Sequence, residues 1–319
     1  MSVMSEEFWR DKRVLVTGGA GFVGSHVVER LRQTRAVSEE NIVVPRSSTH
    51  DLRQLDQCED VMRGVRIVLH LAGDVGGMGY SAGHPASQYY NSTLIDLHVM
   101  EAARRAGIDK MIAVGSATAY PAQAVSPLRE EALFDGLPFA SHLGYGYAKR
   151  SLAVQVRVFQ RQYGLDAAVV MPTNSYGPRD NFDRATSHVI PATIGKCLED
   201  PRLVVWGDGS AVRDFLYVED LAEGVLLAAE RLAPGEHVNL GSGEEVSVKD
   251  LVTLIAELTG FVGTIVFDAD KPGGEARRVL CTERAKRLIG FEPRWTLRDG
   301  LARTLDWYRA AAGADRGRA

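Results

Sequence analysis

A glycine-rich turn near the start of the chain constrains the fold more than any other feature. The apolar run 13–18 (RVLVTG) is typical of a short strand, and it leads into GGAGFVG at 18–24, whose glycines recur every three residues. A helical pattern follows. A strand, a turn without Cβ atoms and a helix N-terminus allow backbone N–H groups to meet a pyrophosphate. The alternative is a glycine-rich turn without a ligand. The residues predicted to contact a dinucleotide here are Gly18, Gly21, Phe22, Val23 and Gly24.

Apolar strands alternate with helical stretches through the first 170 residues. This alternation implies parallel pairing with right-handed crossovers, and strands that are apolar throughout indicate a sheet covered on both faces. The predicted fold class is therefore α/β, with a doubly wound parallel Rossmann sheet. The predicted strands are 13–18, 41–45, 66–73, 110–116 and 166–172, and the helices are 25–33, 52–63, 87–106 and 147–163.

The texture of the sequence changes after Pro172, where a polar, turn-rich segment begins. Further on, 215–232 is typical of a strand end and an amphipathic helix, and 237–243 of another core strand. We expect a dinucleotide-binding domain at 13–172, with 214–241 returning to it. A smaller, interleaved C-terminal substrate domain is expected at 173–213 and 242–312.

Composition excludes several classes of protein. The 319 residues are 45% hydrophobic and 24% charged, with 37 Lys and Arg against 41 Asp and Glu, which argues for a globular chain without a nucleic-acid footprint. No long apolar run or secretory leader is present, so we expect a cytoplasmic protein with no membrane partner. The three scattered cysteines indicate reduced thiols, and the eight histidines show no metal-ligand spacing.

The end of the second strand bears on the choice of cofactor. An acid there would bind the ribose 2′-hydroxyl of NAD(H), but the strand is followed by Arg46, Ser47 and Ser48. A guanidinium pairs strongly with phosphate oxygens, which favours NADP(H), with NAD(H) as the alternative and a solvated loop arginine also open. Asp51, next to Leu52, would accept a hydrogen bond from the adenine or cap the following helix.

Tyr145 and Lys149 stand four residues apart on a predicted helix, and therefore on one face. A neighbouring ammonium favours tyrosinate and is expected to lower the phenol pKa toward working pH. Ser116 ends the fourth strand, at the edge of a parallel sheet where ligands bind. These three residues predict a proton-relay set for oxidation and reduction at a carbinol or ketone.

With these residues in place, the sequence resembles the extended short-chain dehydrogenase/reductase family, also called the NAD-dependent epimerase/dehydratase family. Within it the resemblance is to the GDP-fucose synthase group. It is carried by HLAGDVGGMG (70–79), GSATAYP (115–121), MPTNSYGPRDNF (171–182), SHVIPA (187–192), VVWGDGSAVRDFLYVEDLA (204–222) and KPGGEARR (271–278).

The resemblance implies roles for individual residues. Tyr145 is the general acid/base, Lys149 its partner, and Ser116 a hydrogen-bond donor to the reacting oxygen. The third strand end would contact the cofactor through Leu71, Ala72 and Gly73. The nucleotide-sugar, GDP-linked by resemblance, would be contacted by Thr118, Asn174, His188, Trp206, Arg213 and Lys271. For Arg213 the alternative is a structural ion pair, and for Trp206 a place in the core.

The sequence departs from the group at one catalytic position. A cysteine thought to epimerise C3 and C5 together with a histidine is replaced by Thr118, whereas the histidine matches His188. An alcohol lacks the acidity of a thiol, so we expect double epimerisation to be weak or absent. His188 then has either a catalytic, a substrate-binding or a structural role. The acids of related dehydratases are also missing after Ser116, which argues against dehydration.

Two reactions at C4 of a nucleotide-sugar remain. A reductase uses NADPH on a 4-keto sugar, and an epimerase retains NAD and returns the hydrogen to the other face. The missing acid after the second strand favours the reductase. A non-catalytic dinucleotide-binding regulator is a remote alternative, and a serine hydrolase lacks its G-x-S-x-G turn. The family implies a homodimer formed through the helices at 87–106 and 147–163.

Overall fold

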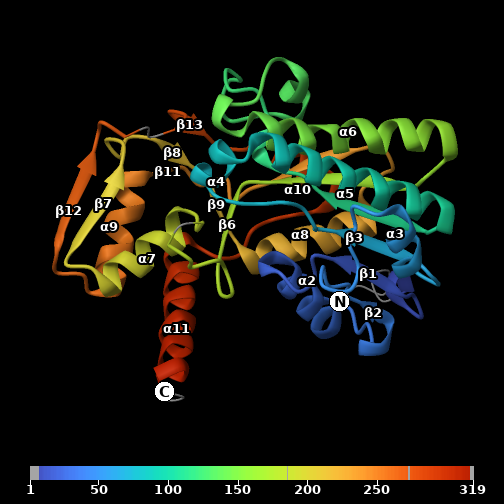
Figure 1. Ribbon diagram of the computed structural model, residues 1–319, viewed down its shortest axis with the longest axis horizontal. Helices are drawn as coiled ribbons and strands as arrows, with labels where there is room; N and C mark the ends of the chain where they lie inside the picture. Colours follow the sequence, from blue (N-terminus) through green and yellow to red (C-terminus); the bar gives the residue numbers. More distant parts are fainter. Residues whose placement is uncertain (1–6, 185, 272–273, 317–319) are drawn as a thin grey trace.

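The computed structural model describes residues 7–184, 186–271 and 274–316 and is built around a six-stranded parallel sheet (Figure 1). The strands run in the order β10-β5-β4-β3-β1-β2. Their bounds are β1 Val14–Thr17, β2 Ile42–Val43, β3 Ile67–His70, β4 Lys110–Val114, β5 Ala167–Pro172 and β10 His237–Leu240. This arrangement confirms the predicted α/β class. The chain turns in opposite directions on either side of β1, so a crevice opens beyond the carboxyl ends of β1 and β3.

Helices cover both faces of this sheet, as Figure 1 shows. One face carries α3 (Leu55–Val61), α5 (Pro85–Ala106) and α6 (Leu143–Tyr163), and the other carries α2 (Phe22–Thr34), α8 (Val218–Arg231) and α10 (Glu283–Ile289). Successive strand residues point to opposite faces. Leu15 therefore packs with α5 and α6, whereas Val14 and Val16 pack with α2 and α8.

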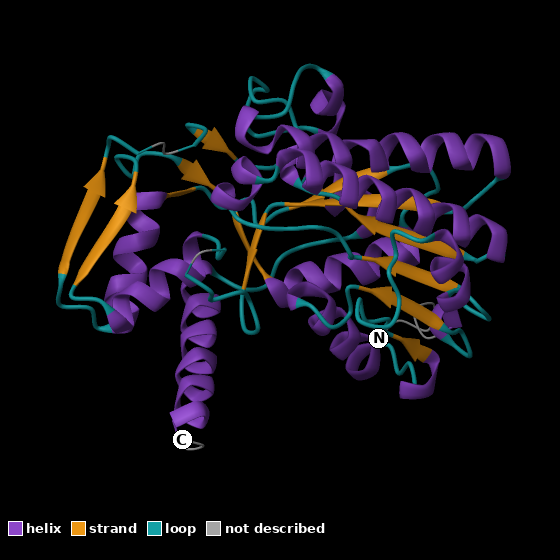
Figure 2. Ribbon diagram, viewed as in Figure 1, coloured by secondary structure: helices purple, strands orange, loops and turns teal. Residues whose placement is uncertain are grey.

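A third hydrophobic core lies beside the main sheet. It is formed by α7 (Val189–Glu199), α9 (Val248–Thr259) and α11 (Leu297–Arg316) with the parallel pair β7 (Arg202–Trp206) and β12 (Thr264–Asp268), set apart from the main sheet in Figure 2. Smaller ladders join it to the rest of the chain. They are β6 (Asn174–Tyr176) with β9 (Phe215–Tyr217), and β8 (Val212–Arg213) with β11 (Val246–Ser247) and β13 (Arg277–Arg278).

Several element boundaries differ from the sequence-based prediction; the strand expected at 110–116, for example, ends at Val114, two residues before Ser116. The strand expected at 41–45 spans only Ile42–Val43, because Pro45 has no N–H to extend the pairing. The strand expected at 66–73 ends at His70. The helix expected from 147 begins at Leu143, which places Tyr145 in its first turn. The predicted stop at Gly107 is confirmed, since this residue caps α5 with a left-handed φ of 63°.

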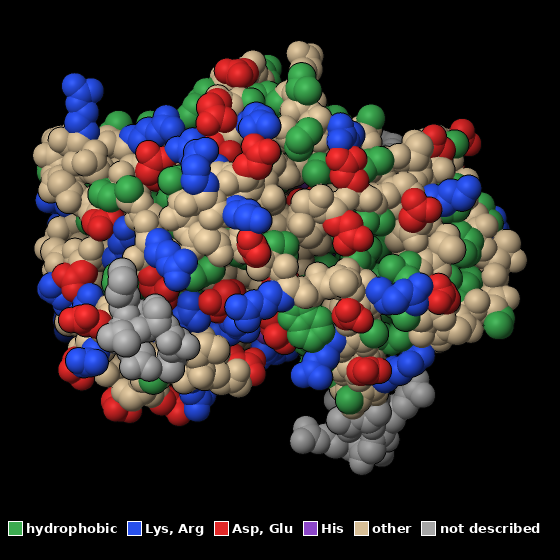
Figure 3. All heavy atoms as spheres, turned by 180° about the vertical axis from the view of Figure 1, so that it is seen from behind, with side chains coloured by type: hydrophobic (Ala, Val, Ile, Leu, Met, Phe, Trp, Pro, Cys, Tyr) green, Lys and Arg blue, Asp and Glu red, His purple; other side chains and the backbone are tan. Residues whose placement is uncertain are grey.

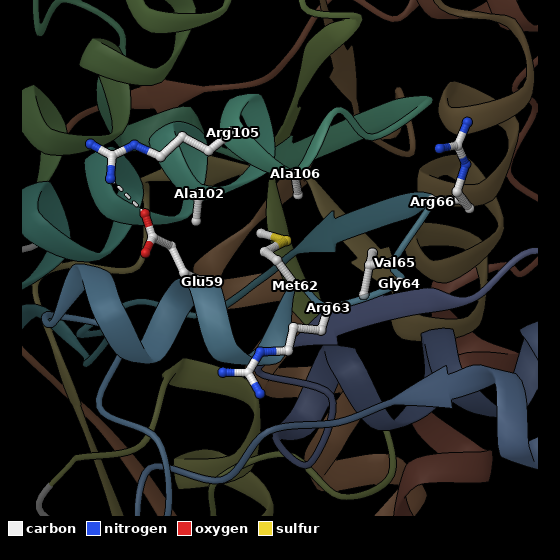
Figure 4. Close-up of a pocket in the computed structure, with 9 residues that line it drawn as sticks. All are labelled: Glu59, Met62, Arg63, Gly64, Val65, Arg66, Ala102, Arg105 and Ala106. Carbon is white, nitrogen blue, oxygen red and sulfur yellow. Dashed lines mark hydrogen bonds and ion pairs between the residues drawn. The ribbon is translucent and has the colours of Figure 1, made fainter.

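Acidic and basic side chains are interspersed over the face shown in Figure 3. A pocket lies between α3, α5 and the segment leading into β3 (Figure 4), at the amino ends of the strands. Its arginines are exposed and already paired, as Arg105 is with Glu59 at 2.6 Å. This pocket is therefore separate from the crevice at the carboxyl ends. Within the described residues, no helix combines the length and apolar character needed to cross a bilayer.

Candidate active site

The glycine turn brings α2 and β3 close together at the crevice. Gly18 has a φ of 68°, and a Cβ added there would stand 2.9 Å from the backbone nitrogen of Ala72. A Cβ on Gly24 would overlap the backbone of Gly18. Gly21 caps the N-terminus of α2, ahead of Phe22 and Val23, with no side chain bonded to it. The first N–H groups of α2 therefore face the crevice without a capping side chain, as an anion site requires.

The ends of β1 and β3 are tied to each other and to Lys149. The backbone nitrogens of Leu71 and Ala72 donate to Thr17 Oγ1 at 3.1 and 3.2 Å. The next residue, Gly73, faces the ammonium of Lys149, and a Cβ there would lie 3.4 Å from Lys149 Nζ. The predicted cofactor residues of β3 and the predicted catalytic lysine thus share one corner of the crevice.

The residues beyond β2 differ in exposure and pairing. Arg46 is exposed, and within the described chain no hydrogen bond or ion pair engages its guanidinium. Asp51 Oδ1 accepts from the backbone nitrogen of Arg53 at 3.0 Å and from its guanidinium at 2.9 Å. The helix-cap alternative for Asp51 is wrong, because α3 starts at Leu55 and its N-cap is Gln54. Leu52 is buried beneath this turn.

Ser116, Tyr145 and Lys149 converge as the sequence predicts. Ser116 precedes a short 3-10 turn at Ala117–Ala119, and its Oγ accepts from Thr118 Oγ1 at 2.8 Å and from Thr118 N at 3.2 Å. Tyr145 lies beside Ser116, close enough for the Ser116 hydroxyl to lower the pKa of the phenol. Lys149, one helical turn from Tyr145, is buried and lies 3.4 Å from Asp96 Oδ1. The three side chains form one connected polar group.

The electrostatics of this group correct one prediction. Burial raises the pKa of the Tyr145 phenol, and the opposing effects of Lys149 and of the Ser116 hydroxyl do not cancel it. The expectation of a lowered phenol pKa is therefore wrong in its net direction, because desolvation of the phenolate outweighs the ammonium. Burial alone would lower the pKa of Lys149, but the charges of Asp96 and Tyr145 raise it overall.

Two histidines lie near the Ser116 turn. His188 directly precedes α7, and desolvation of its ring by the surrounding protein lowers the ring's pKa. Within the described residues its ring makes no hydrogen bond. His142 directly precedes α6, and burial lowers its pKa, as do the nearby Arg278 and His188. His142 was missed in the sequence, where nothing but its proximity to Tyr145 marks it.

The predicted substrate residues lie on the third hydrophobic core or at its junction with the main sheet. Asn174 is exposed and donates through Nδ2 to the carbonyl of Asp214 at 3.1 Å. Trp206 ends β7 with 54% of its surface exposed, so the alternative of a core tryptophan is wrong. Arg213 donates to its neighbour's carbonyl at 2.8 Å and lies near the charges of Glu275 and Arg278. Lys271 is exposed.

Further residues at the site escaped sequence reasoning. Arg278 donates to the carbonyl of Ala117 and pairs with Glu275, which fixes the catalytic turn to β13. Behind Lys149, Asp96 and His70 are fully buried. The sequence does carry a signal for Asp96, which shares the buried face of α5 with Ser92 and Val99. An acid on a buried helix face needs a hydrogen-bonding or charged partner.

Residues 14–241 match the NAD dependent epimerase/dehydratase family. The chain is 34% identical over 302 residues to GDP-L-fucose synthase of Sinorhizobium fredii, covering 92% of this chain and 95% of that protein. The structure of the GDP-L-fucose synthetase of Naegleria fowleri bound to NADP superposes with a TM-score of 0.84 at 26% identity, covering 95% of each chain. The UDP-glucose 4-epimerase of Thermotoga maritima, solved with UDP-glucose, gives 0.83 at 28% identity, over 94% of this chain and 99% of that one.

The doubly wound sheet, the glycine turn and the Ser-Tyr-Lys group define an enzyme that uses a nicotinamide dinucleotide. The chain belongs to the NAD-dependent epimerase/dehydratase family, within the extended short-chain dehydrogenase/reductases.

Proposed function

We propose that this enzyme is a reductase that acts at C4 of a GDP-linked 4-keto sugar with NADP(H). The observation that carries the proposal is the placement of Tyr145 beside Ser116 and the buried ammonium of Lys149, at the crevice where the glycine turn opens. The relatedness to GDP-L-fucose synthases over nearly the whole chain supports the GDP-sugar.

The residues of the crevice fit a dinucleotide. Gly18 and Gly24 leave no room for a Cβ, and the N-terminus of α2 would hold the pyrophosphate. Arg46 would hold the 2′-phosphate of NADP(H), because its guanidinium is exposed and engages no other described residue. When bound, the nicotinamide supplies or accepts the hydrogen at C4 of the sugar. NADP(H) in place of NAD(H) is part of the proposal.

Tyr145 serves as the acid of the reduction. Its raised pKa keeps the phenol protonated at neutral pH, so it has a proton to give to the oxygen at C4. Ser116 Oγ receives the hydroxyl hydrogen of Thr118, which leaves its own hydrogen for the sugar oxygen or for Tyr145. The Lys149 ammonium stabilises the phenolate that remains after proton transfer and would hold the nicotinamide ribose.

The substrate would lie between the Ser116 turn and the third hydrophobic core. The GDP-sugar would be contacted by Asn174, Trp206, Arg213 and Lys271. Among them Arg213 suits the diphosphate, because a guanidinium can donate two hydrogen bonds to phosphate oxygens. We assign residues 173–213 and 242–312 to this substrate domain, and 13–172 with 214–241 to the dinucleotide domain. We also assign a homodimer formed through α5 and α6, whose outer faces carry exposed apolar side chains.

Double epimerisation at C3 and C5 is left out of the proposal. Thr118 occupies the cysteine position, and its hydroxyl is already committed to Ser116 at 2.8 Å. Burial lowers the pKa of His188, which favours a role as hydrogen-bond donor to the sugar. Without a basic partner it does not complete an epimerising pair.

One observation favours a second candidate, the C4 epimerase that retains NAD. The likeness to a UDP-glucose 4-epimerase extends over 94% of this chain. The two candidates differ in whether the cofactor leaves after each reaction. Mass spectrometry of the purified enzyme separates them, since tightly retained NAD supports the epimerase.

The direct test supplies a GDP-4-keto-6-deoxy sugar with NADPH and follows NADPH consumption at 340 nm. We expect one NADPH consumed for each sugar reduced, and a product with a hydroxyl at C4 by mass spectrometry and NMR. A second arm compares NADPH and NADH by calorimetry in wild type and Arg46→Ala, with Arg63→Ala as an exposed control remote from the crevice. Loss of the NADPH preference in Arg46→Ala alone supports the cofactor assignment; absence of NADPH consumption would refute the reductase.

A further inference from the structure

A chain of buried polar groups continues behind the catalytic lysine into the core. Lys149 Nζ lies 3.4 Å from Asp96 Oδ1, the same oxygen lies 3.0 Å from His70 Nε2, and His70 Nδ1 lies 2.7 Å from Thr17 Oγ1. Thr17, His70 and Asp96 have no exposed surface, and Lys149 is 3% exposed. These four residues, the buried support, come from β1, β3, α5 and α6.

The protons in the buried support are fixed by counting donors. Thr17 Oγ1 already accepts two backbone N–H groups, from Leu71 and Ala72, so its own hydrogen is free to be given to His70 Nδ1. His70 Nδ1 is then an acceptor, and the ring carries its hydrogen on Nε2. That hydrogen is donated to Asp96 Oδ1. The imidazole is thus neutral, and one carboxylate faces one ammonium.

The carboxylate of Asp96 has few hydrogen-bond and ion-pair partners. Its Oδ2 is buried and, among the described residues, accepts no hydrogen bond. The negative charge is therefore shared between Lys149 and the Nε2–H of His70 and is not dispersed over other donors. Because a buried ammonium without a counter-charge releases its proton readily, Lys149 depends on this carboxylate for its charge.

We propose that Asp96, held in place by His70 and Thr17, is a positioning residue that keeps Lys149 charged and directed at Tyr145. This inference rests on the proposed roles of Tyr145 and Lys149. The support begins at Thr17, which ends β1 directly before the glycine turn, so the catalytic ammonium and the dinucleotide turn are located by the same buried contacts.

Removal of the carboxylate has a defined electrostatic consequence. In Asp96→Asn the burial of Lys149 remains but the opposing negative charge is lost, so the lysine pKa falls. The charged groups that face Tyr145 are Lys149 and Asp96, together with Asp74 on the loop after β3. Among these Lys149 has the larger effect on the phenol and is the only cation. Its discharge therefore outweighs the loss of the Asp96 charge and raises the phenol pKa further.

The test follows the lysine itself. The full-length enzyme is labelled with 13Cε-lysine, the Lys149 signal is assigned by its absence in Lys149→Arg, and spectra are recorded from pH 7 to 10.5. We expect wild-type Lys149 to remain charged across this range, because its pKa is raised, and Lys149 in Asp96→Asn to titrate within it, since a neighbouring opposite charge changes a pKa by roughly 1–3 units. Asp96→Glu retains a carboxylate and keeps the titration near that of wild type, and His70→Leu gives a smaller shift than Asp96→Asn.

A matched control removes a buried hydrogen bond elsewhere. Thr304→Val loses the bond from Thr304 Oγ1 to the carbonyl of Gly300 at 2.7 Å, within α11, and leaves the Lys149 titration unchanged. An Asp96→Asn titration equal to that of wild type overturns the proposal, as does an equal shift in Thr304→Val.

Turnover provides the second readout. At pH 8 we expect kcat of Asp96→Asn to fall at least about tenfold, with KM for the sugar within about threefold and with recovery in Asp96→Glu. Unchanged kcat alongside a shifted titration would overturn the link to catalysis. If the wild type reduces no GDP-4-keto sugar, the proposed function fails while the NMR titration still decides the role of Asp96.

Discussion

Tyr145 carries its proton across the physiological range. Burial raises its pKa above the ordinary value of about 10 for a phenol, and the pKa of Lys149 is raised as well. Reduction needs the protonated phenol, so we expect kcat to be flat through neutral pH and to decline only above about pH 10. The measurement is kcat against pH with saturating NADPH. A decline centred near pH 7 would show that another acid limits the reaction.

Thr118 decides whether the substrate exchanges carbon-bound hydrogen. A threonine hydroxyl is a poor base, whereas a thiol with a pKa near 8.5 ionises appreciably. In D2O we therefore expect wild type and Thr118→Ser to place no deuterium at C3 or C5 of a 4-keto GDP-sugar. Thr118→Cys, with His188 nearby, should raise incorporation at least about tenfold over wild type. Rapid exchange by the wild type, seen by NMR, would mean that another residue, such as His142, acts as the base.

At the scale of elements, a buried ion-pair group fastens α2 to α8. Arg35, which caps α2, pairs with Glu223 at 2.7 Å and with Glu230 at 2.8 Å, and the Arg35 and Glu230 side chains are both 6% exposed. Arg35→Leu would remove the guanidinium from the buried carboxylate of Glu230 and from Glu223, which keeps Arg30 at 2.9 Å. We expect a loss of about 3 kcal/mol in the free energy of unfolding, measured with urea.

A matched control lies one turn earlier on the same helix. Arg32 pairs with Glu39, and both side chains are more than half exposed. Arg32→Leu should therefore change the free energy of unfolding by less than about 0.5 kcal/mol. Equal losses in the two variants would show that burial of the Arg35 group does not govern the packing of α2 on α8.

At the scale of the whole molecule, the outer faces of α5 and α6 carry apolar side chains, which a monomer would expose to solvent. Tyr90 and Leu97 on α5, and Val154 and Val158 on α6, are between 39% and 62% exposed, at helical spacings of seven and four residues. We predict a dimer of twice the chain mass of 34.8 kDa in sedimentation. Val154→Glu with Val158→Glu should give monomers that remain folded by circular dichroism. A monomeric wild type would contradict the assignment.

Much of this architecture follows from local pattern. The strands are apolar throughout and the glycine turn is distinctive, so the sheet and Ser116, Tyr145 and Lys149 could be predicted from the sequence. Asp96 and His70 could not, because their partners are 26 to 53 residues away in the sequence and meet only in the folded sheet. The direction of the Tyr145 pKa shift could not be predicted either, since it depends on how strongly the fold desolvates the phenol.

The central claim is that Tyr145 transfers the proton in the reaction at C4, and substitution by phenylalanine tests it most directly. Tyr145→Phe keeps the ring and removes the hydroxyl, so NADPH binding by calorimetry should stay within about threefold of wild type. We predict that kcat with NADPH and a GDP-4-keto-6-deoxy sugar falls at least about a hundredfold. A kcat near that of wild type, with cofactor binding intact, would contradict the account.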